Sequence, residues 1–471
     1  MALVEIATAA ARLTCFVERA GIIEPADRNW AYNRIIECCG VAGSRPDFVE
    51  LREGYDFEAD LAVLAEAGVS AGYAEDTATG RDRLAMRIMG ALLPRPSEMA
   101  RHFAQLVETL GPQSATDWFY RICVDADYVR ASAIARNIAW EHESTWGTLE
   151  ITINKSKPEK DPRDIAAAGA AQTGEVYPAC QLCVENEGYA GRPAADPFGP
   201  HPARQNLRII PIELGGERWG FQYSPYAYFT EHCIAMSSEH RPMHIDRAAL
   251  TCLLDFVDLF PHYFIGSNAD LPIVGGSILS HDHFQGGRHV FPMMKAPVIE
   301  EFRLIPFLGV RAGVVSWPMS VLRLACEDRG ALLEAAIYVT DAWRAWTDER
   351  VGIRAVDEDG TLHNTVTPIC RRVDGEYVLD LALRCNVTTD EHPLGVFHPH
   401  EDKWHVKKEN IGLIEVMGLA ILPPRLETAM DEGSLTREEI GAVFSGVLED
   451  AGVFKWDDEG RAALHRFLDS L

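Results

Sequence analysis

The densest group of side chains that could do chemistry is the run Ser280-His281-Asp282-His283-Phe284-Gln285-Gly286-Gly287. Alternate residues of an extended strand share a face, so His281, His283 and Gln285 would converge on one side. Neutral imidazole is a good nucleophile toward phosphorus near pH 7, and a carboxamide beside it can hold phosphoryl oxygens. The two glycines let the backbone approach a ligand closely. The pattern favours chemistry at phosphorus; the alternatives are a histidine-rich surface strand and a simple metal site.

A second group is Cys180-Gln181-Leu182-Cys183, which has the spacing of half a tetrahedral zinc site. Its remaining ligands would be the first histidine of the motif, His281, and one histidine from the middle of the chain. The candidates for that position, all between the cysteine pair and the motif, are His232, His240 and His244. The alternatives are a redox pair and two unrelated core thiols.

The loop 154–160 carries three lysines directly after a β-rich segment: Lys155, Lys157 and Lys160. The formal charge of the chain is −26, from 44 basic and 70 acidic residues, so a local gathering of lysines suits a phosphorylated ligand. A solvated charged turn is the alternative. The same acidic excess argues against nucleic acid or an anionic membrane as a partner, because both need a basic face.

A third group, His398-Pro399-His400 with His405 close behind, favours a structural histidine network or a second metal site over catalysis.

With 471 residues the chain is long enough for about three domain-sized units. It has no run of about 18 uncharged apolar residues, and charged residues interrupt its first 20 positions. We therefore expect neither a membrane span nor a signal peptide. The eleven cysteines form no visible disulfide framework, which favours reduced thiols and a cytoplasmic protein.

Helical spacing of apolar residues over 99–110, with alanine-rich stretches at 9–13 and 61–67, predicts a mostly helical region over 1–145. Beyond it, 149–153 is typical of a strand. Gly215-Gly216 between two β-rich runs predicts a hairpin. Asp246 is placed to cap a helix that ends before Pro261.

The second half repeats this order. Residues 314–324 are strand-like, 330–346 form an amphipathic helical pattern, and Asp374-Gly375 predicts a hairpin. Because a His-x-His pair occurs in each half, we infer an internal duplication. The predicted parts are a helical N-terminal region over 1–145, two halves over 146–300 and 301–425, and a helical tail over 426–471.

Several blocks of this sequence resemble the second-type bacterial galactose-1-phosphate uridylyltransferases. They occur in order and span roughly residues 145–425: 149–154, 156–162, 231–234, 254–256, 266–272, 275–283 and 408–418. The resemblance implies an α+β fold of two fused histidine-triad-like half-units, each an antiparallel sheet with helices, beside the helical N-terminal region.

The resemblance also implies a nucleotidyltransferase of galactose metabolism. Such an enzyme moves a uridylyl group between UDP-glucose and galactose 1-phosphate through a covalent uridylyl-histidine. It uses no organic cofactor and commonly forms a homodimer.

In the family's H-x-H-x-Q motif the second histidine, here His283, is the nucleophile, and the glutamine, here Gln285, contacts the transferred phosphoryl group. We expect the other ring nitrogen of His283 to donate to a backbone carbonyl, which fixes the attacking tautomer. Asp282 stands where first-type members have proline, and strand alternation directs it to the opposite face. The predicted phosphate-binding residues are Asn268 and Ser277, which match the family's phosphate-contacting region, together with Lys155 and Lys157.

In first-type members zinc is bound by the Cys-x-x-Cys pair, a histidine of a Ser-Pro-Asp-His stretch and the first histidine of the motif. The matching residues here are Cys180, Cys183, His240 and His281, with His232 as the other candidate for the third ligand. First-type members also carry iron in the second half, but its ligands do not map onto this chain, so no iron is predicted.

Two other functions remain open at the level of sequence. A nucleotide phosphorylase or hydrolase of the same superfamily would pass the nucleotidyl group to phosphate or water. A non-enzymatic zinc-binding interaction protein would bind metal without turnover.

Overall fold

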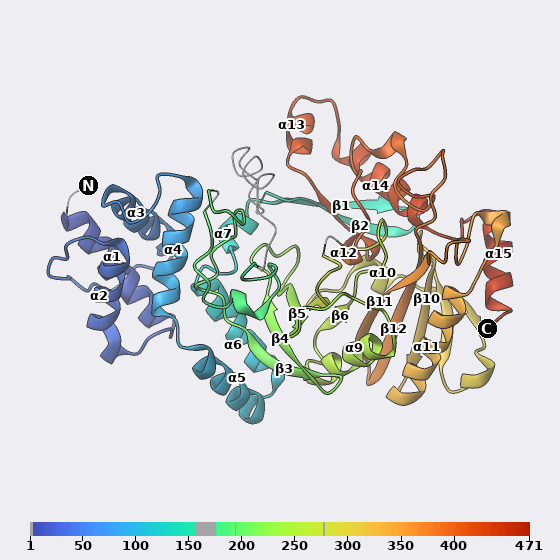
Figure 1. Cartoon of the computed structure of the whole chain (residues 1–471), viewed down its shortest axis with the longest axis horizontal. Helices are drawn as coiled ribbons and strands as arrows, with labels where there is room; N and C mark the ends of the chain where they lie inside the picture. Colours follow the sequence, from blue (N-terminus) through green and yellow to red (C-terminus); the bar gives the residue numbers. More distant parts are fainter. Residues whose placement is uncertain (1–2, 156–175, 194, 277) are drawn as a thin grey trace. The chain divides into compact units, whose positions relative to one another are not determined.

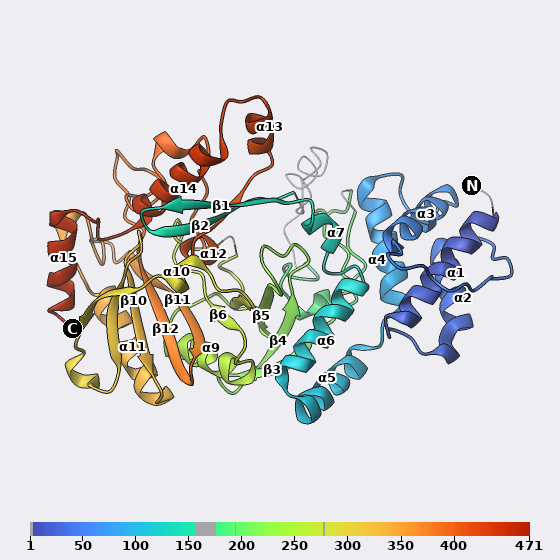
Figure 2. The same cartoon turned by 180° about the vertical axis from the view of Figure 1, so that it is seen from behind.

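The computed structural model describes residues 3–155, 176–193, 195–276 and 278–471 (Figures 1 and 2). The chain divides into two compact units. The first contains the described residues of Met1–Ala131, Pro158–Pro211 and Gly220–Tyr226, and the second those of Ser132–Lys157, Ile212–Trp219 and Ala227–Leu471. Across the described ranges, we find no helix with the length and apolar character that a membrane crossing requires.

Helices make up most of the first unit, as the sequence predicts. Asp56 and Thr77 cap two of them by accepting hydrogen bonds from backbone N–H groups of the first turn. The stretches 9–13, 61–67 and 99–110 lie in α1, α3 and α5. The helices are α1 (Leu3–Arg19), α2 (Arg28–Cys39), α3 (Phe57–Ser70), α4 (Ala78–Leu92), α5 (Pro96–Leu110) and α6 (Pro112–Asp125), with the short α7 (Ala131–Ile134) after them.

A ten-stranded sheet in the order β3-β4-β5-β7-β6-β11-β12-β10-β9-β8 contains His283 and Gln285 of the H-x-H-x-Q motif, whereas His281 precedes the strand and so does not share their strand face as predicted. The predicted hairpins form at Gly215-Gly216 and Asp374-Gly375. The predicted strand 314–324 is instead two strands, because the segment between them contains Pro318, which has no N–H for a sheet. The strands are β3 (Ile210–Leu214), β4 (Glu217–Tyr223), β5 (Cys233–Ser237), β6 (Phe264–Gly266), β7 (His283–Gly287), β8 (Val298–Phe302), β9 (Arg311–Val315), β10 (Val321–Cys326), β11 (Asn364–Val373) and β12 (Glu376–Cys385).

The strand order confirms the predicted duplication. The first half runs β3, β4, β5, α9 (Arg247–Leu259), β6, β7 along the chain, and the second half runs β8, β9, β10, α11 (Arg329–Arg344), β11, β12. Counted outward from the antiparallel β6–β11 pair, both halves have the same spatial order. The predicted fold class, two fused half-units of antiparallel sheet and helix with a helical N-terminal region, is therefore correct.

The predicted phase of the repeat is wrong. The hairpin at Gly215-Gly216 corresponds to β8–β9, whereas the hairpin at Asp374-Gly375 corresponds to β6–β7. His398 and His400 follow β12 and lie outside the sheet, so they are not the counterpart of the first His-x-His pair. Local turn signals cannot show which hairpins are equivalent, because equivalence depends on pairing across the sheet.

Helices α9 (Arg247–Leu259) and α11 (Arg329–Arg344) pack on one face of this sheet, as Figures 1 and 2 show. Asp246 caps α9 as predicted, with its carboxylate accepting from the backbone N–H of Ala249 at 3.0 Å. On the other side lies a three-stranded sheet in the order β1-β2-β13, formed by β1 (Ile138–Ser144), β2 (Gly147–Ile153) and β13 (Leu419–Leu422).

A buried core joins this small sheet, α14 and the large sheet of the second unit. It includes Ile151, Trp317, Ile369 and Phe444, none more than 1% exposed. Most of the predicted C-terminal tail is helical. The remaining helices are α10 (Pro292–Lys295), α12 (Leu413–Val416), α13 (Arg425–Asp431), α14 (Arg437–Ala451) and α15 (Asp458–Leu468).

An ion cluster around the fully buried Asp380 holds β10, β11 and β12 together. The Asp380 carboxylate accepts from Arg323 at 2.6 Å and also from Arg371. Burial alone would raise the pKa of Asp380, but the two guanidinium groups outweigh burial and hold this pKa below its usual value.

We expect Asp380→Ala to destabilise the second unit by about 3–5 kcal/mol, because two largely buried cations lose their only shared anion. Urea unfolding followed by tryptophan fluorescence measures this loss. Glu358→Ala, at an exposed position, is the control and should unfold like the wild type. Equal midpoints for the two variants would contradict the role assigned to the cluster.

Candidate active site

Strand β7 lies between β5 and β6 and is antiparallel to both. His283 is opposite Met236, and Gln285 is opposite Ile234, so the two side chains are two residues apart and share one face. Gly286 permits this close pairing, because a Cβ atom there would lie 2.3 Å from the carbonyl oxygen of Phe264.

The ring of His283 is buried and held in one orientation. Its Nδ1 lies 2.7 Å from the backbone carbonyl oxygen of His281, which confirms the predicted contact. A carbonyl oxygen only accepts, so Nδ1 has the proton and the lone pair of Nε2 is available. Burial lowers the pKa of His283 to about 4, which keeps the imidazole neutral near pH 7.

The carboxamide of Gln285 contacts a histidine that the sequence indicated only as an alternative metal ligand. Nε2 of His232 lies 3.0 Å from Oε1 of Gln285. His232 is buried, and burial lowers its pKa to about 4. The contact depends on the pairing of β5 with β7, which chain order does not reveal.

Asp282 points to the opposite face, as predicted. Its carboxylate lies 3.4 Å from Nε of Arg241 and lines a cavity together with Ala249 and Cys252 of α9. Phe284, two residues after Asp282 and on the same face, stacks on Trp219 with ring centroids 4.9 Å apart. The Asp282 carboxylate therefore lies away from the face that carries His283 and Gln285.

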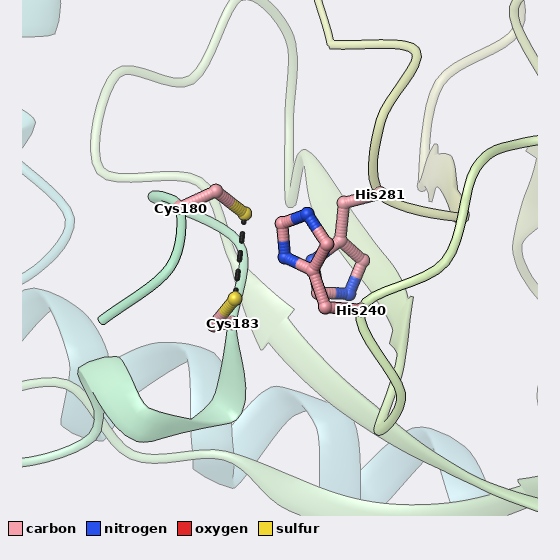
Figure 3. A group of neighbouring side chains, drawn as sticks. All are labelled: Cys180, Cys183, His240 and His281. Carbon is pink, nitrogen blue, oxygen red and sulfur yellow. Dashed lines mark hydrogen bonds between the residues drawn. The ribbon is translucent and has the colours of Figure 1, made fainter. Parts of the chain in front are cut away.

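The predicted metal ligands form one group in Figure 3. The sulfur atoms of Cys180 and Cys183 are 3.5 Å apart, and the rings of His240 and His281 have centroids 4.9 Å apart. One ligand atom from each of these four residues lies within 4.8 Å of every other. Nε2 of His281 lies 2.9 Å from the carbonyl oxygen of Ser237. Two thiolates and two imidazoles suit a tetrahedral metal ion such as zinc.

Comparisons with known proteins decide the family. The model "Galactose-1-phosphate uridyl transferase, N-terminal domain" matches residues 58–242, and the corresponding C-terminal domain model matches residues 256–441. The galactose-1-phosphate uridylyltransferase of Lactiplantibacillus plantarum is 46% identical over 94% of this chain and 95% of its own length. The galactose-1-phosphate uridylyltransferase of Bacillus subtilis is 45% identical over 94% of this chain and 94% of its own length. This chain belongs to the galactose-1-phosphate uridylyltransferase family.

The resemblance found in the sequence is thus confirmed, and the chain is an enzyme of this family. Among solved structures, the yeast Ap4A phosphorylase Apa2 matches with 13% identity and a TM-score of 0.39. The match covers 69% of this chain and 95% of that one. A TM-score at this level does not by itself establish a common fold.

Of the four predicted phosphate-binding residues of this uridylyltransferase-family chain, the structure describes two, Asn268 and Lys155. Asn268 is buried, and its Oδ1 accepts from the backbone N–H of Leu413 at 2.8 Å. The ammonium group of Lys155 lies 2.8 Å from the Glu427 carboxylate, so binding a phosphate would require this ion pair to open. Ser277 and Lys157 lie outside the described residues.

The third histidine group makes the contacts of a structural network. Nε2 of His398 lies 3.3 Å from Oδ1 of Asn410, and the ring of His400 stacks on His392 with centroids 4.4 Å apart. Within the described ranges, the only group of three or more potential metal ligands is the one around Cys180.

We expect Gly286→Ala to lower the thermal unfolding midpoint, because its Cβ would collide with the Phe264 carbonyl and push β7 away from β6. The displacement would also misplace His283 and Gln285. Gly309→Ala is the matched control, since no atom lies within 4 Å of the added methyl group. Calorimetry on both variants checks this, and a wild-type midpoint for Gly286→Ala would show that β7 tolerates a side chain there.

Proposed function

We propose that this enzyme exchanges a uridylyl group between UDP-glucose and galactose 1-phosphate, and that His283 carries the group between the two sugar phosphates. The supporting observation is the buried, neutral ring of His283, with Nδ1 held by the His281 carbonyl and Nε2 available. The family membership of the chain supports the choice of substrates.

In the first step the lone pair of Nε2 of His283 attacks the α-phosphorus of UDP-glucose in line. The bond from phosphorus to the bridging oxygen breaks, and its electron pair leaves with glucose 1-phosphate. The ring then carries the uridylyl group on Nε2 and the proton on Nδ1, so it is cationic. The carbonyl oxygen of His281, 2.7 Å from Nδ1, stabilises that charge.

In the second step an oxygen of galactose 1-phosphate attacks the same phosphorus from the vacated side. The phosphorus–nitrogen bond breaks, its electron pair returns to Nε2, and UDP-galactose is released. Both leaving groups form without a proton, so positioning and charge stabilisation carry the catalysis.

Gln285 is proposed to donate its amide N–H groups to the non-bridging oxygens of the transferred phosphoryl group. Asn268, Ser277, Lys155 and Lys157 are proposed to bind the substrate phosphates. For Asn268 the support is geometric: its Oδ1 is occupied by the Leu413 N–H, which leaves its amide nitrogen as a donor.

Incubation with UDP-glucose alone should add one uridylyl group to the peptide that contains His283, because the first step needs no acceptor. Peptide mass spectrometry measures the adduct, and His283→Ala should abolish it. Adding galactose 1-phosphate should discharge the adduct as UDP-galactose. An adduct on His281, or none, would disprove the assignment, and steady release of UMP without an acceptor would favour the hydrolase.

The group of Cys180, Cys183, His240 and His281 is proposed to hold a structural zinc ion. Burial raises the pKa of the Cys183 thiol to about 12, so a bound cation would have to displace its proton. The ion would then link the Cys180–Cys183 loop to His281.

We expect the purified enzyme to contain about one zinc ion per chain, because four suitable donors already lie together. Elemental analysis measures this content. Cys180→Ser should reduce both zinc content and thermal stability, whereas Cys252→Ser, at a cysteine outside the group, should keep the zinc. A metal-free wild-type protein with full stability would contradict the proposal.

The homodimer and the cytoplasmic location predicted from the sequence remain proposals. Size-exclusion chromatography with light scattering would test the first.

A further inference from the structure

His232 lies on the same sheet face as the proposed catalytic side chains. It directly precedes β5 and is two residues before Ile234, which is opposite Gln285. His232 and Gln285 are therefore diagonal neighbours on one face, a relation that long side chains can bridge. Nε2 of His232 and Oε1 of Gln285 are 3.0 Å apart.

The backbone before β5 holds the His232 ring in place. Glu231 has a left-handed φ of 55°, which is unusual for a residue with a side chain. Its carboxylate contacts the Tyr263 hydroxyl and lies 3.3 Å from Arg288. Gly287 makes room for this turn, since a Cβ there would lie 2.6 Å from the carbonyl oxygen of Glu231.

Aromatic packing restricts the ring further. The Phe229 ring centroid lies 4.6 Å from that of His232, and the backbone N–H of His232 donates to the Phe229 carbonyl. The ring therefore has little freedom to turn away from Gln285.

The remaining contacts determine which ring nitrogen has the proton. Nδ1 of His232 is buried and has no hydrogen-bond partner among the described residues. A buried N–H without an acceptor is rarer in proteins than an unused acceptor. The proton therefore belongs on Nε2, which donates to Oε1 of Gln285 and turns the amide NH₂ group the other way.

We propose that His232 is a positioning residue that fixes the orientation of the Gln285 carboxamide, so that its NH₂ group and not its oxygen faces the transferred phosphoryl group. This inference rests on the proposed function of Gln285. Without His232 the amide can rotate by half a turn and present Oε1 to the anionic phosphoryl oxygens, which repels them.

The tautomer can be measured without any substrate. Nitrogen-15 NMR of histidine-labelled enzyme should show His232 as the neutral Nε2–H form, with the resonance assigned by its loss in His232→Phe. The Nδ1–H form would overturn the proposal, because the amide would then have to donate to Nε2. This readout stands even if the proposed substrates are wrong.

Kinetics of uridylyl exchange test the action through Gln285. Removing a phosphoryl donor with Gln285→Met should lower kcat by about 10²–10³-fold, and His232→Phe should lower kcat by about 10-fold or more with little change in KM. In the Gln285→Met background, His232→Phe should have no further effect on kcat. His232→Gln, whose amide nitrogen can take the place of Nε2, should restore most of the lost kcat.

His142→Phe is the control, because His142 is also a buried histidine but lies in β1 of the three-stranded sheet. It should keep the wild-type kcat. An equal loss from His232→Phe in both backgrounds, or no loss at all, would overturn the positioning role. Absence of exchange in the wild type would instead count against the proposed function.

Discussion

The pairing of β7 on both of its edges is the constraint on which the site depends. A strand hydrogen-bonded to β5 on one side and β6 on the other cannot shift by one residue without moving every side chain to the other face. This pairing keeps His283 and Gln285 together and Asp282 away from them. It also brings the His281 carbonyl to Nδ1 of His283, so the proposed nucleophile is oriented before any substrate arrives.

Equivalent strand positions in the two halves of the sheet carry side chains with different roles. Gly266 and Ile369 face each other across the junction, so Gln285, opposite Gly266, corresponds to Asp380, opposite Ile369. In the first half this place carries an amide proposed to act on phosphate. In the second half it carries a buried carboxylate between Arg323 and Arg371. In the second half this place therefore holds strands together, whereas in the first half it belongs to the strand that carries the proposed nucleophile.

The sequence predicted local features well, because each depends on neighbours along the chain. The Asp246 cap, the Gly215-Gly216 turn and the period of two in the motif are of this kind. The equivalence of the hairpins and the contact of His232 with Gln285 were not predictable, because both depend on which strands pair. The four residues of the proposed metal site were chosen through the resemblance, since spacing alone left three candidate histidines for the third position.

Burial of two neutral histidines sets the chemistry available on this face. Burial lowers the pKa values of His283 and His232 to about 4, so neither ring contributes a charge near pH 7. What each ring can do then depends on where its single proton lies. A carbonyl holds the proton of His283 on Nδ1 and leaves the lone pair of Nε2 for the proposed attack, whereas the amide of Gln285 draws the proton of His232 to Nε2. The two rings would therefore hold opposite tautomers. His283 would attack phosphorus through its unprotonated Nε2, and His232 would orient Gln285 through its protonated Nε2.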